Sequence, residues 1–233
     1  MIDQQVKNNL GNIELSQLKQ RARVLLLLDA AERAGIAPLR SSRLHAFAYL
    51  ANVLSPVWDL VPFDGKIYKS EGGPHYPDLQ SELDRLVVLG LVEISNLKYI
   101  DRGNDGARID GEYGLNFSSK FLEPILNAIG GGDADKAIDY GDYNLHAFLV
   151  ELACALATLA DDQLDAAVAA DVTYRSGGAL NNVIDFGEWG TDTNLSVLTA
   201  QRFQNFLPQS SSLRPGEKLF LYATYLGKVM DAA

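Results

Sequence analysis

The sequence predicts a mainly α-helical protein of the α+β class, in which an N-terminal winged helix-turn-helix domain is followed by a helical C-terminal domain. Three segments with helical spacing come first, two strand-like segments joined by a glycine- and aspartate-rich loop come next, and mostly helical patterns follow. Three glycines at 130–132 suit a boundary, because glycine costs backbone entropy inside a regular element. The expected parts are an N-terminal polar arm with the start of the first helix (1–20), a winged-helix domain (21–130) and a helical domain (131–233).

The first two predicted helices have recognisable ends. Residues 14–34 form the first, which Gly35 closes and Pro38 follows. Ser41 is the expected N-cap of the second helix, SRLHAFAYLANVLSP, because its hydroxyl can accept a hydrogen bond from a free backbone N–H. The apolar stripe of this helix consists of Leu44, Phe47, Ala48, Ala51 and Leu54. The segment FDGKIYK (63–69) is predicted to be a short strand or an extended arm.

The third predicted helix, residues 77–89, takes the place of the helix that reads DNA in a winged helix. Its apolar residues repeat at three- and four-residue steps and form a core stripe, and Gly90 ends it. These residues are Leu79, Leu83, Leu86 and Val87. After Gly90, the segments LVEIS, LKYID and EYGLN are strand-like, and residues 102–111 are the expected wing. A closing helix is predicted to start at Ser118 or Ser119, which completes the winged-helix order.

The second half of the chain is predicted to be mostly helical. The helical segments are 143–160, 162–174, 195–207 and 215–230. The first of them is apolar on nearly every face, so it is expected to be central or covered by a partner. Segment 175–194 is irregular and too long for a simple connector. In the last helix Pro215 suits the first turn, and the apolar stripe makes Leu219, Tyr222 and Leu226 candidates for a protein interface.

Composition and charge argue against an autonomous nucleic-acid-binding protein. The net charge is −10, and neither the first 129 residues (14 basic, 16 acidic) nor the remainder (6 basic, 14 acidic) is basic. The single cysteine, Cys154, excludes an intramolecular disulfide and a cysteine-based zinc cluster, and it fits a reducing compartment. No signal peptide opens the chain, and the apolar stretch 145–160 is too short to span a bilayer. The expected location is therefore cytoplasmic.

No residue pattern indicates catalysis, so we expect a protein that is not an enzyme and has neither a cofactor nor a metal site. His45, His75 and His146 are far apart in the sequence, and no pair has the spacing of helical metal ligands. The acidic cluster at 133–142 lacks the ligand positions and the glycine of a calcium loop. No glycine-rich stretch has the ending of a phosphate-binding loop.

One catalytic hypothesis remains, in the segment VIDFGEW. Asp185, Glu188 and Trp189 could belong to an unrecognised active site. The competing interpretation, which we favour, is a packed loop anchored by Phe186 and Trp189.

The polar face of the third helix carries the wrong charge for DNA. Asp78, Glu82 and Asp84 oppose one base, Arg85, and carboxylates near a polyanion lower its affinity. We therefore predict that these four residues belong to a protein interface. The basic residues that could contact a DNA backbone lie elsewhere: Arg21, Arg23, Arg40, Arg43, Lys66 and Lys69. The same six residues could instead hold an acidic partner or form a solvated face, and the sequence leaves these alternatives open.

Several segments resemble a known group of bacterial winged-helix proteins. The resemblance is carried by LHAFAYLANVLSP, GPHYPDLQSELDRLVVLGLVEI, the glycine-rich wing, YGLNFSSKFLEPIL, NNVIDFGEW and PGEKLFLYATYL, over residues 20–230. The group comprises the middle components of ABC-three-component and Lamassu-type defence systems. The resemblance implies a small non-catalytic subunit that binds an SMC/Rad50-like ATPase and links it to an effector, often a nuclease, acting on invading DNA.

Two functions from different classes therefore compete. The preferred hypothesis is an assembly subunit for anti-phage or anti-plasmid defence, which meets DNA through its complex. The alternative is a winged-helix transcription regulator or antitoxin-like repressor, which would bind DNA as a dimer through the six basic residues named above.

Overall fold

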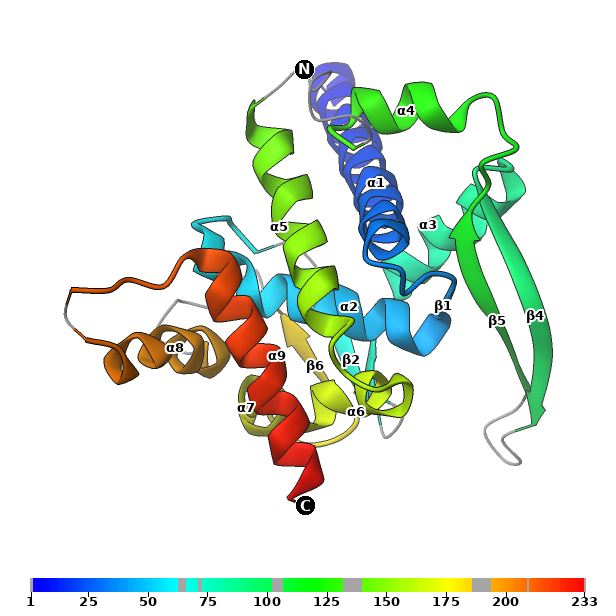
Figure 1. Cartoon of the computed structure of the whole chain (residues 1–233). Coiled ribbons are helices and arrows are strands. Elements are labelled where there is room, and N and C mark those ends of the chain that lie inside the picture. Colours follow the sequence, from blue (N-terminus) through cyan, green and yellow to red (C-terminus); the bar gives the residue numbers. More distant parts are fainter. Residues whose placement is uncertain are drawn as a thin grey trace.

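The computed structural model describes residues 2–62, 66–70, 73–101, 107–131, 140–185, 194–208 and 210–232. In this part of the chain the protein is mostly helical and carries two small sheets, which confirms the α+β class (Figure 1). The α-helices are α1 (Ile2–Arg33), α2 (Ser41–Leu54), α3 (Pro77–Val88), α4 (Leu122–Ala128), α5 (Tyr140–Leu156), α6 (Asp161–Ala170), α7 (Val172–Ser176), α8 (Leu195–Arg202) and α9 (Pro215–Asp231). The strands are β1 (Leu39–Arg40), β2 (Lys66–Ser70), β3 (Gly73–His75), β4 (Val92–Asp101), β5 (Ala107–Leu115) and β6 (Asn182–Asp185). Two 3₁₀ turns, η1 (Ser55–Trp58) and η6 (Phe203–Phe206), follow α2 and α8.

Helix α1 begins much earlier than the apolar pattern indicates. It is helical from Ile2, so the predicted start at residue 14 is wrong and the expected polar arm belongs to the helix. The stretch 2–13 contains no proline, and its glutamine, lysine and leucine residues are good helix formers even without an apolar stripe. The predicted C-terminal end is nearly right, because the helix stops at Arg33.

Helix α3 has nearly the boundaries that its sequence predicts. It begins at Pro77 and ends at Val88, and Gly90 follows with a φ of 69°, in the left-handed region that favours glycine. The Gly90 N–H donates to the carbonyl of Val87 at 3.0 Å, and the next N–H donates to the carbonyl of Leu86 at 3.0 Å. These two bonds close the helix in a Schellman motif.

The start of α2 differs from the prediction. The helix begins at Ser41 itself, and Arg40, the residue at the cap position, makes no capping bond with its side chain. Arg40 belongs to β1 and pairs with Glu112, so the chain turns directly from strand to helix. The Ser41 hydroxyl instead donates to Gln80 Oε1 at 3.0 Å and thereby connects α2 to α3.

The first sheet is antiparallel and has the order β1–β5–β4. The predicted segments LVEIS and LKYID form the single strand β4, whose register with β5 shifts between Ser95 and Lys98. Figure 1 shows β4 and β5 as a long hairpin that extends away from the helices. Residues 102–106 of the predicted wing (102–111) lie outside the described residues, and the remainder of the wing forms the start of β5.

The second sheet joins segments that the sequence assigned to different domains. Its order is β3–β2–β6, and Ile67 of β2 is paired with Ile184 of β6. Strand β2 lies where an extended segment was predicted, at 63–69. Strand β6 lies within the segment 175–194 that was predicted to be irregular. A strand of four residues depends on its partner, which a local pattern cannot identify.

Several helices after the first sheet depart from prediction. Helix α5 ends at Leu156 and α8 at Arg202, before the predicted ends at 160 and 207. The predicted helix 162–174 is two helices, α6 and α7, because Asp171 between them has an extended backbone (φ −63°, ψ 130°). Helix α4 starts at Leu122, after the predicted starts at Ser118 and Ser119. Helix α9 begins with Pro215 in its first turn, as predicted.

The hydrophobic core is continuous across the predicted boundary at 130. Its largest fully buried side chains include Tyr49 of α2, Phe148 of α5 and Tyr222 of α9. Helix α5 lies between α1 and α9 and packs on both (Figure 1). The predicted segments 21–130 and 131–233 thus share one core and one sheet.

Helix α5 contains most of the apolar stretch 145–160 and is 17 residues long. Among the described residues, no helix combines the length and the apolar character that crossing a bilayer requires. The cytoplasmic location stays a prediction.

Candidate functional site

Helix α3 packs against α1 and leads into the β4–β5 hairpin (Figure 1). Of the predicted core stripe, Leu79, Leu83 and Leu86 are buried, and Val87 is partly buried against the core. The exposed residues of the helix are Pro77, Asp78, Ser81, Asp84, Arg85 and Val88. The open face of α3 therefore combines two acids, one base and an apolar side chain.

Glu82 does not lie on that open face as the sequence analysis expected. It is 5% exposed, and its Oε2 accepts a bond from Arg21 Nε at 2.5 Å while its Oε1 accepts one from Arg85 Nη1 at 2.5 Å. A buried carboxylate requires such partners, because its desolvation is otherwise strongly unfavourable. Of the three acids predicted for the interface, only Asp78 and Asp84 are exposed.

The C-terminal end of α3 exposes large apolar side chains. Val88 is 87% exposed and Leu89 is 58% exposed. Beside them lies a groove of about 510 Å³, which we call the α3 groove. It is lined by Arg21, Ser81, Asp84, Arg85, Val88 and Leu89. The groove thus brings together a base from α1 and the charged and apolar residues of α3.

Arg23, one of the six predicted DNA-contacting cations, is an interior residue. It is 3% exposed, and its Nη2 donates to Ala48 O and to Asn52 Oδ1, each at 3.2 Å. Its guanidinium carbon lies 5.4 Å from the centre of the Tyr76 ring. Burial lowers the pKa of Arg23 to about 10, although Tyr76 acts in the opposite direction. Arg23 therefore stabilises the contact between α1 and α2 and cannot reach a DNA backbone.

Two more of the six cations, Arg43 and Lys69, are also buried. Lys69 Nζ donates to the carbonyl of Tyr174 at 2.5 Å and to that of Gly178 at 2.8 Å. Of the remaining three, Arg21 binds Glu82, Lys66 lies 3.3 Å from Asp185, and Arg40 is half-buried. The structure therefore does not gather the six residues into one basic surface.

The three residues predicted for an apolar interface on α9 are buried too. Leu219, Tyr222 and Leu226 are each 0% exposed, because α9 packs against α5, α6 and α8. The apolar stripe of this helix belongs to the core. The large apolar residues that α9 does expose are Phe220 and Leu221, at 37% and 40%.

A buried polar cluster around Asp171, which we call the Asp171 network, was not predicted. Asp171 is 0% exposed; its Oδ1 accepts bonds from the Tyr49 hydroxyl and the Tyr174 N–H, both at 2.8 Å. Its Oδ2 accepts bonds from the Ser196 hydroxyl at 2.7 Å and the Tyr222 hydroxyl at 2.6 Å. Burial first, and the negative charge of Asp171 second, raise the pKa of Tyr49 and of Tyr222. The local signal was Asp171 as the N-cap of α7, which its bond from Tyr174 confirms.

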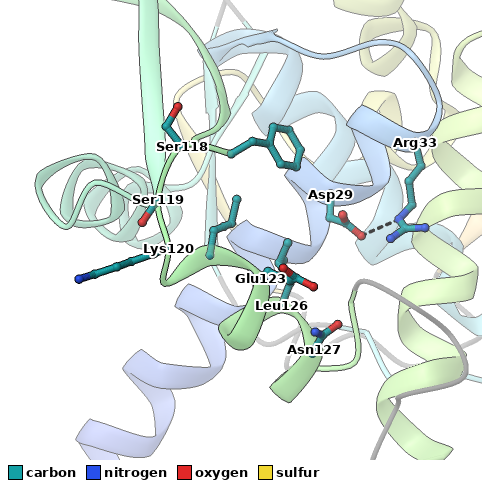
Figure 2. Close-up of a pocket in the computed structure, with 10 residues that line it drawn as sticks. Asp29, Arg33, Ser118, Ser119, Lys120, Glu123, Leu126 and Asn127 are labelled. Atoms are coloured by element: carbon teal, nitrogen blue, oxygen red, sulfur yellow. Dashed lines mark hydrogen bonds and ion pairs between the residues drawn. The ribbon is translucent and has the colours of Figure 1, made fainter.

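A second pocket, of about 380 Å³, lies between α1 and the start of α4 (Figure 2). It is lined by Asp29, Arg33, Phe117, Ser118, Ser119, Lys120, Leu122, Glu123, Leu126 and Asn127. Figure 2 shows the hydroxyls of Ser118 and Ser119 pointing away from Asp29. These serines are therefore not placed to act as nucleophiles activated through Asp29.

Asp29, at the edge of this pocket, is hydrogen-bonded to Arg33 and His146. Its Oδ2 lies 2.8 Å from Arg33 Nε and 2.6 Å from His146 Nε2. Burial acts to raise the pKa of Asp29, but the bonds from His146 and Arg33 outweigh burial and hold that pKa below its usual value. His146 thus connects α5 to α1, as expected for a histidine at the edge of a core.

His45, His75 and Asp185, the first acid of the VIDFGEW hypothesis, have partners in the structure. His45 is buried, accepts a bond from the Tyr76 N–H on Nδ1 at 3.1 Å, and has its ring centre 4.8 Å from that of His75. Asp185 is half-buried and forms an ion pair with Lys66. Glu188 and Trp189, with Phe186 and most of the acidic cluster 133–142, lie outside the described residues.

Neither a metal centre nor a known relative identifies the site. Where the chain is described, no three His, Cys, Asp or Glu side chains gather as metal ligands would. No protein-family model matches the chain, and no curated protein or solved structure is significantly similar to it. The functional conclusion therefore rests on the geometry of α3 and its surroundings.

Proposed function

We propose that this chain is a non-catalytic winged-helix subunit that binds an SMC/Rad50-like ATPase and links it to an effector, such as a nuclease, in anti-phage or anti-plasmid defence. The element order α1–β1–α2–β2–β3–α3–β4–β5, in which β2 and β3 of the second sheet are inserted between α2 and α3, and the sheet order β1–β5–β4 support the winged-helix assignment. The resemblance of its segments to the middle components of ABC-three-component and Lamassu-type systems supports the partner assignment.

The surface of α3 is the observation that carries this proposal. A DNA-reading helix offers bases and amides to the major groove, whereas α3 offers Asp78 and Asp84 together with Val88. Its one exposed base, Arg85, is outnumbered by these two acids. Acids repel a phosphate backbone, and exposed apolar side chains gain free energy when a protein covers them. In DNA-binding winged helices the third helix contacts bases, whereas the exposed side chains of α3 are suited to contact with a protein partner.

The alternative of a DNA-binding regulator or antitoxin-like repressor has less support. It requires a basic surface from six residues, of which Arg23, Arg43 and Lys69 are buried. Lys66 remains exposed but forms an ion pair with Asp185. The net charge of −10 adds a long-range repulsion from DNA.

Co-expression with the products of the neighbouring genes, followed by light scattering of the purified complex, tests the proposal. We expect a stable complex with an SMC-like ATPase, and we expect the isolated chain to leave the fluorescence anisotropy of a labelled DNA duplex unchanged at low salt. If the chain does not bind the ATPase, and binds the duplex with an affinity that falls steeply with salt, the regulator alternative is supported.

A further inference from the structure

We propose that the α3 groove binds an amphipathic helix of a partner protein, with one carboxylate of that helix seated between Arg21 and Arg85. The apolar side chains of the bound helix pack on Val88 and Leu89. This inference rests on the proposed function, because it gives the chemistry of the segment that the α3 surface holds. It adds which end of α3 is used and which charge the partner carries.

The two arginines are positioned as a receptor for a carboxylate. Each gives one N–H to Glu82, Arg21 from Nε and Arg85 from Nη1. A guanidinium has five N–H donors, and among the described residues no other side chain or carbonyl accepts from either arginine. Their side chains are 30% and 48% exposed, so the remaining donors face the groove and solvent. Two cations on the buried Glu82 leave one positive charge between the arginines, and the negative charge of Asp84, which accepts a bond from Gln80, lies in the same groove.

Both guanidiniums are held in place before a ligand arrives. Glu82 is buried between α1 and α3, and its two oxygens fix Arg21 and Arg85 side by side. A side chain that is already ordered loses less conformational entropy on binding. A carboxylate that bridges two fixed guanidiniums therefore gains charge-assisted hydrogen bonds without a large ordering cost.

The apolar part of the groove, Val88 and Leu89, favours a ligand with apolar side chains, such as a helix, over a small anion. Val88 and Leu89 are adjacent in sequence, largely exposed and part of the same concave surface. A helix that lays its apolar face into a groove presents side chains at i, i+3, i+4 and i+7. Such a helix can place a glutamate beside its apolar face, within reach of the arginines.

The acids around the groove distinguish this ligand from nucleic acid. Asp84 lines the groove, where it accepts a bond from Gln80 Nε2 at 2.9 Å, and Asp78 lies on the same exposed face. A phosphate backbone would bring several charges close to both acids and would gain nothing from Val88. A single carboxylate can contact the arginines and leave the acids in solvent.

Fluorescence anisotropy with two synthetic helices tests the inference on the full chain. The first peptide carries leucines at i, i+3, i+4 and i+7 with glutamates beside them, and the second carries lysines in place of the glutamates. We expect the glutamate peptide to bind at least about tenfold more tightly, because two guanidiniums recognise its carboxylate. Arg85→Ala and Val88→Asp should each weaken that binding by about tenfold or more.

The chain provides matched control variants. Val61 is 86% exposed, nearly the same as Val88, and Arg214 forms an i,i+3 ion pair with Glu217 as Arg85 does with Glu82. Val61→Asp and Arg214→Ala should leave peptide binding unchanged. Arg85→Ala retains the bond between Arg21 and Glu82, so the variant keeps its fold, which thermal unfolding verifies.

Four results would overturn the inference: absence of peptide binding, equal binding of both peptides, equal effects of the control variants, or a DNA duplex that displaces the peptide from the groove. The complex with the ATPase separates this inference from the proposed function. If Val88→Asp leaves that complex intact, the groove assignment fails and the proposed function stands. If no ATPase binds any variant while the glutamate peptide binds as expected, the proposed function fails and the groove assignment stands.

Discussion

Two buried carboxylates, Glu82 and Asp171, lie in contrasting surroundings. Asp171 is fully enclosed and accepts bonds from three hydroxyls and one backbone N–H, all of them neutral donors. Glu82 is 5% exposed and accepts bonds from two guanidiniums whose other donors remain open to solvent. Both arrangements satisfy a buried acid, but only the second leaves binding capacity at the surface.

The difference indicates how each carboxylate contributes to the protein. The Asp171 network draws its donors from α2, α7, α8 and α9, so it fixes the segment after residue 130 against the segment before it. The Glu82 cluster joins only α1 and α3 and lies beside the exposed Val88 and Leu89. We infer that the first region determines stability and that the second determines recognition.

Asp171→Ala has the largest expected effect, because it removes the acceptor from the whole network at once. The Tyr49 and Tyr222 hydroxyls and the Tyr174 N–H then lose this acceptor, whereas the Ser196 hydroxyl can still donate to Thr173 Oγ1 at 2.6 Å. Each lost buried bond costs free energy, so we expect unfolding to become easier by about 3 kcal/mol or more. Chemical denaturation followed by circular dichroism measures this change.

Asp231→Ala is the matched control for the Asp171 variant. Asp231 is exposed and accepts a bond from Gln163 Nε2 at 2.9 Å, so its loss should change the free energy of unfolding by less than about 0.5 kcal/mol. Similar stabilities for the two variants would contradict the structural role of the Asp171 network.

Arg23→Ala and Arg85→Ala compare an interior arginine with one at the surface, and both effects should be smaller. Loss of Arg23 removes the donor to Asn52 Oδ1 and the second donor to the Ala48 carbonyl, and it opens a cavity beneath Tyr76, which should destabilise the fold by about 2–3 kcal/mol. Loss of Arg85 leaves Glu82 bound to Arg21, so the expected cost is about 0.5–1 kcal/mol. Urea denaturation of both variants measures the difference, and equal costs would contradict the assignment of Arg23 to the interior.

Local sequence patterns predicted the parts of the fold that depend on near neighbours. The stripe of Leu79, Leu83 and Leu86 and the glycine at position 90 placed α3 nearly to the residue. The apolar run from Val24 to Leu28 also indicates a buried part of α1. Arg23 immediately precedes that run, and its burial follows from its neighbours.

The remainder of the site depends on contacts between residues distant in sequence. Glu82 lies at i+3 from Leu79, beside the apolar stripe, so helical spacing places it near the core, but its partner Arg21 lies on another helix. Strand β6 forms because β2 offers an edge, and Asp171 becomes a centre because α8 and α9 bring Ser196 and Tyr222 to it. No periodicity within one segment carries that information.

A small effect on stability, and the sharpest test of the α3 surface, is expected for the double variant Asp78→Lys with Asp84→Lys. Both side chains are exposed, and each substitution should change the free energy of unfolding by about 0.5 kcal/mol, partly because Asp78 lies in the first turn of α3, where an acid is favourable. DNA affinity, however, should rise, because the repulsion from phosphates becomes an attraction. Anisotropy of a labelled duplex at several salt concentrations measures both the affinity and its salt dependence.

A second double variant, Glu123→Lys with Asp231→Lys, separates the position of the charges from their number. Both variants change two acids to lysines and therefore bring the net charge from −10 to −6, but Glu123 and Asp231 are exposed on α4 and α9. If the two acids of α3 are what keeps a duplex away from this helix, the α3 variant gains the larger affinity and the steeper salt dependence, since its lysines replace those acids. Equal gains would show that only the overall charge keeps DNA away, and the surface of α3 would then no longer favour a protein partner over nucleic acid.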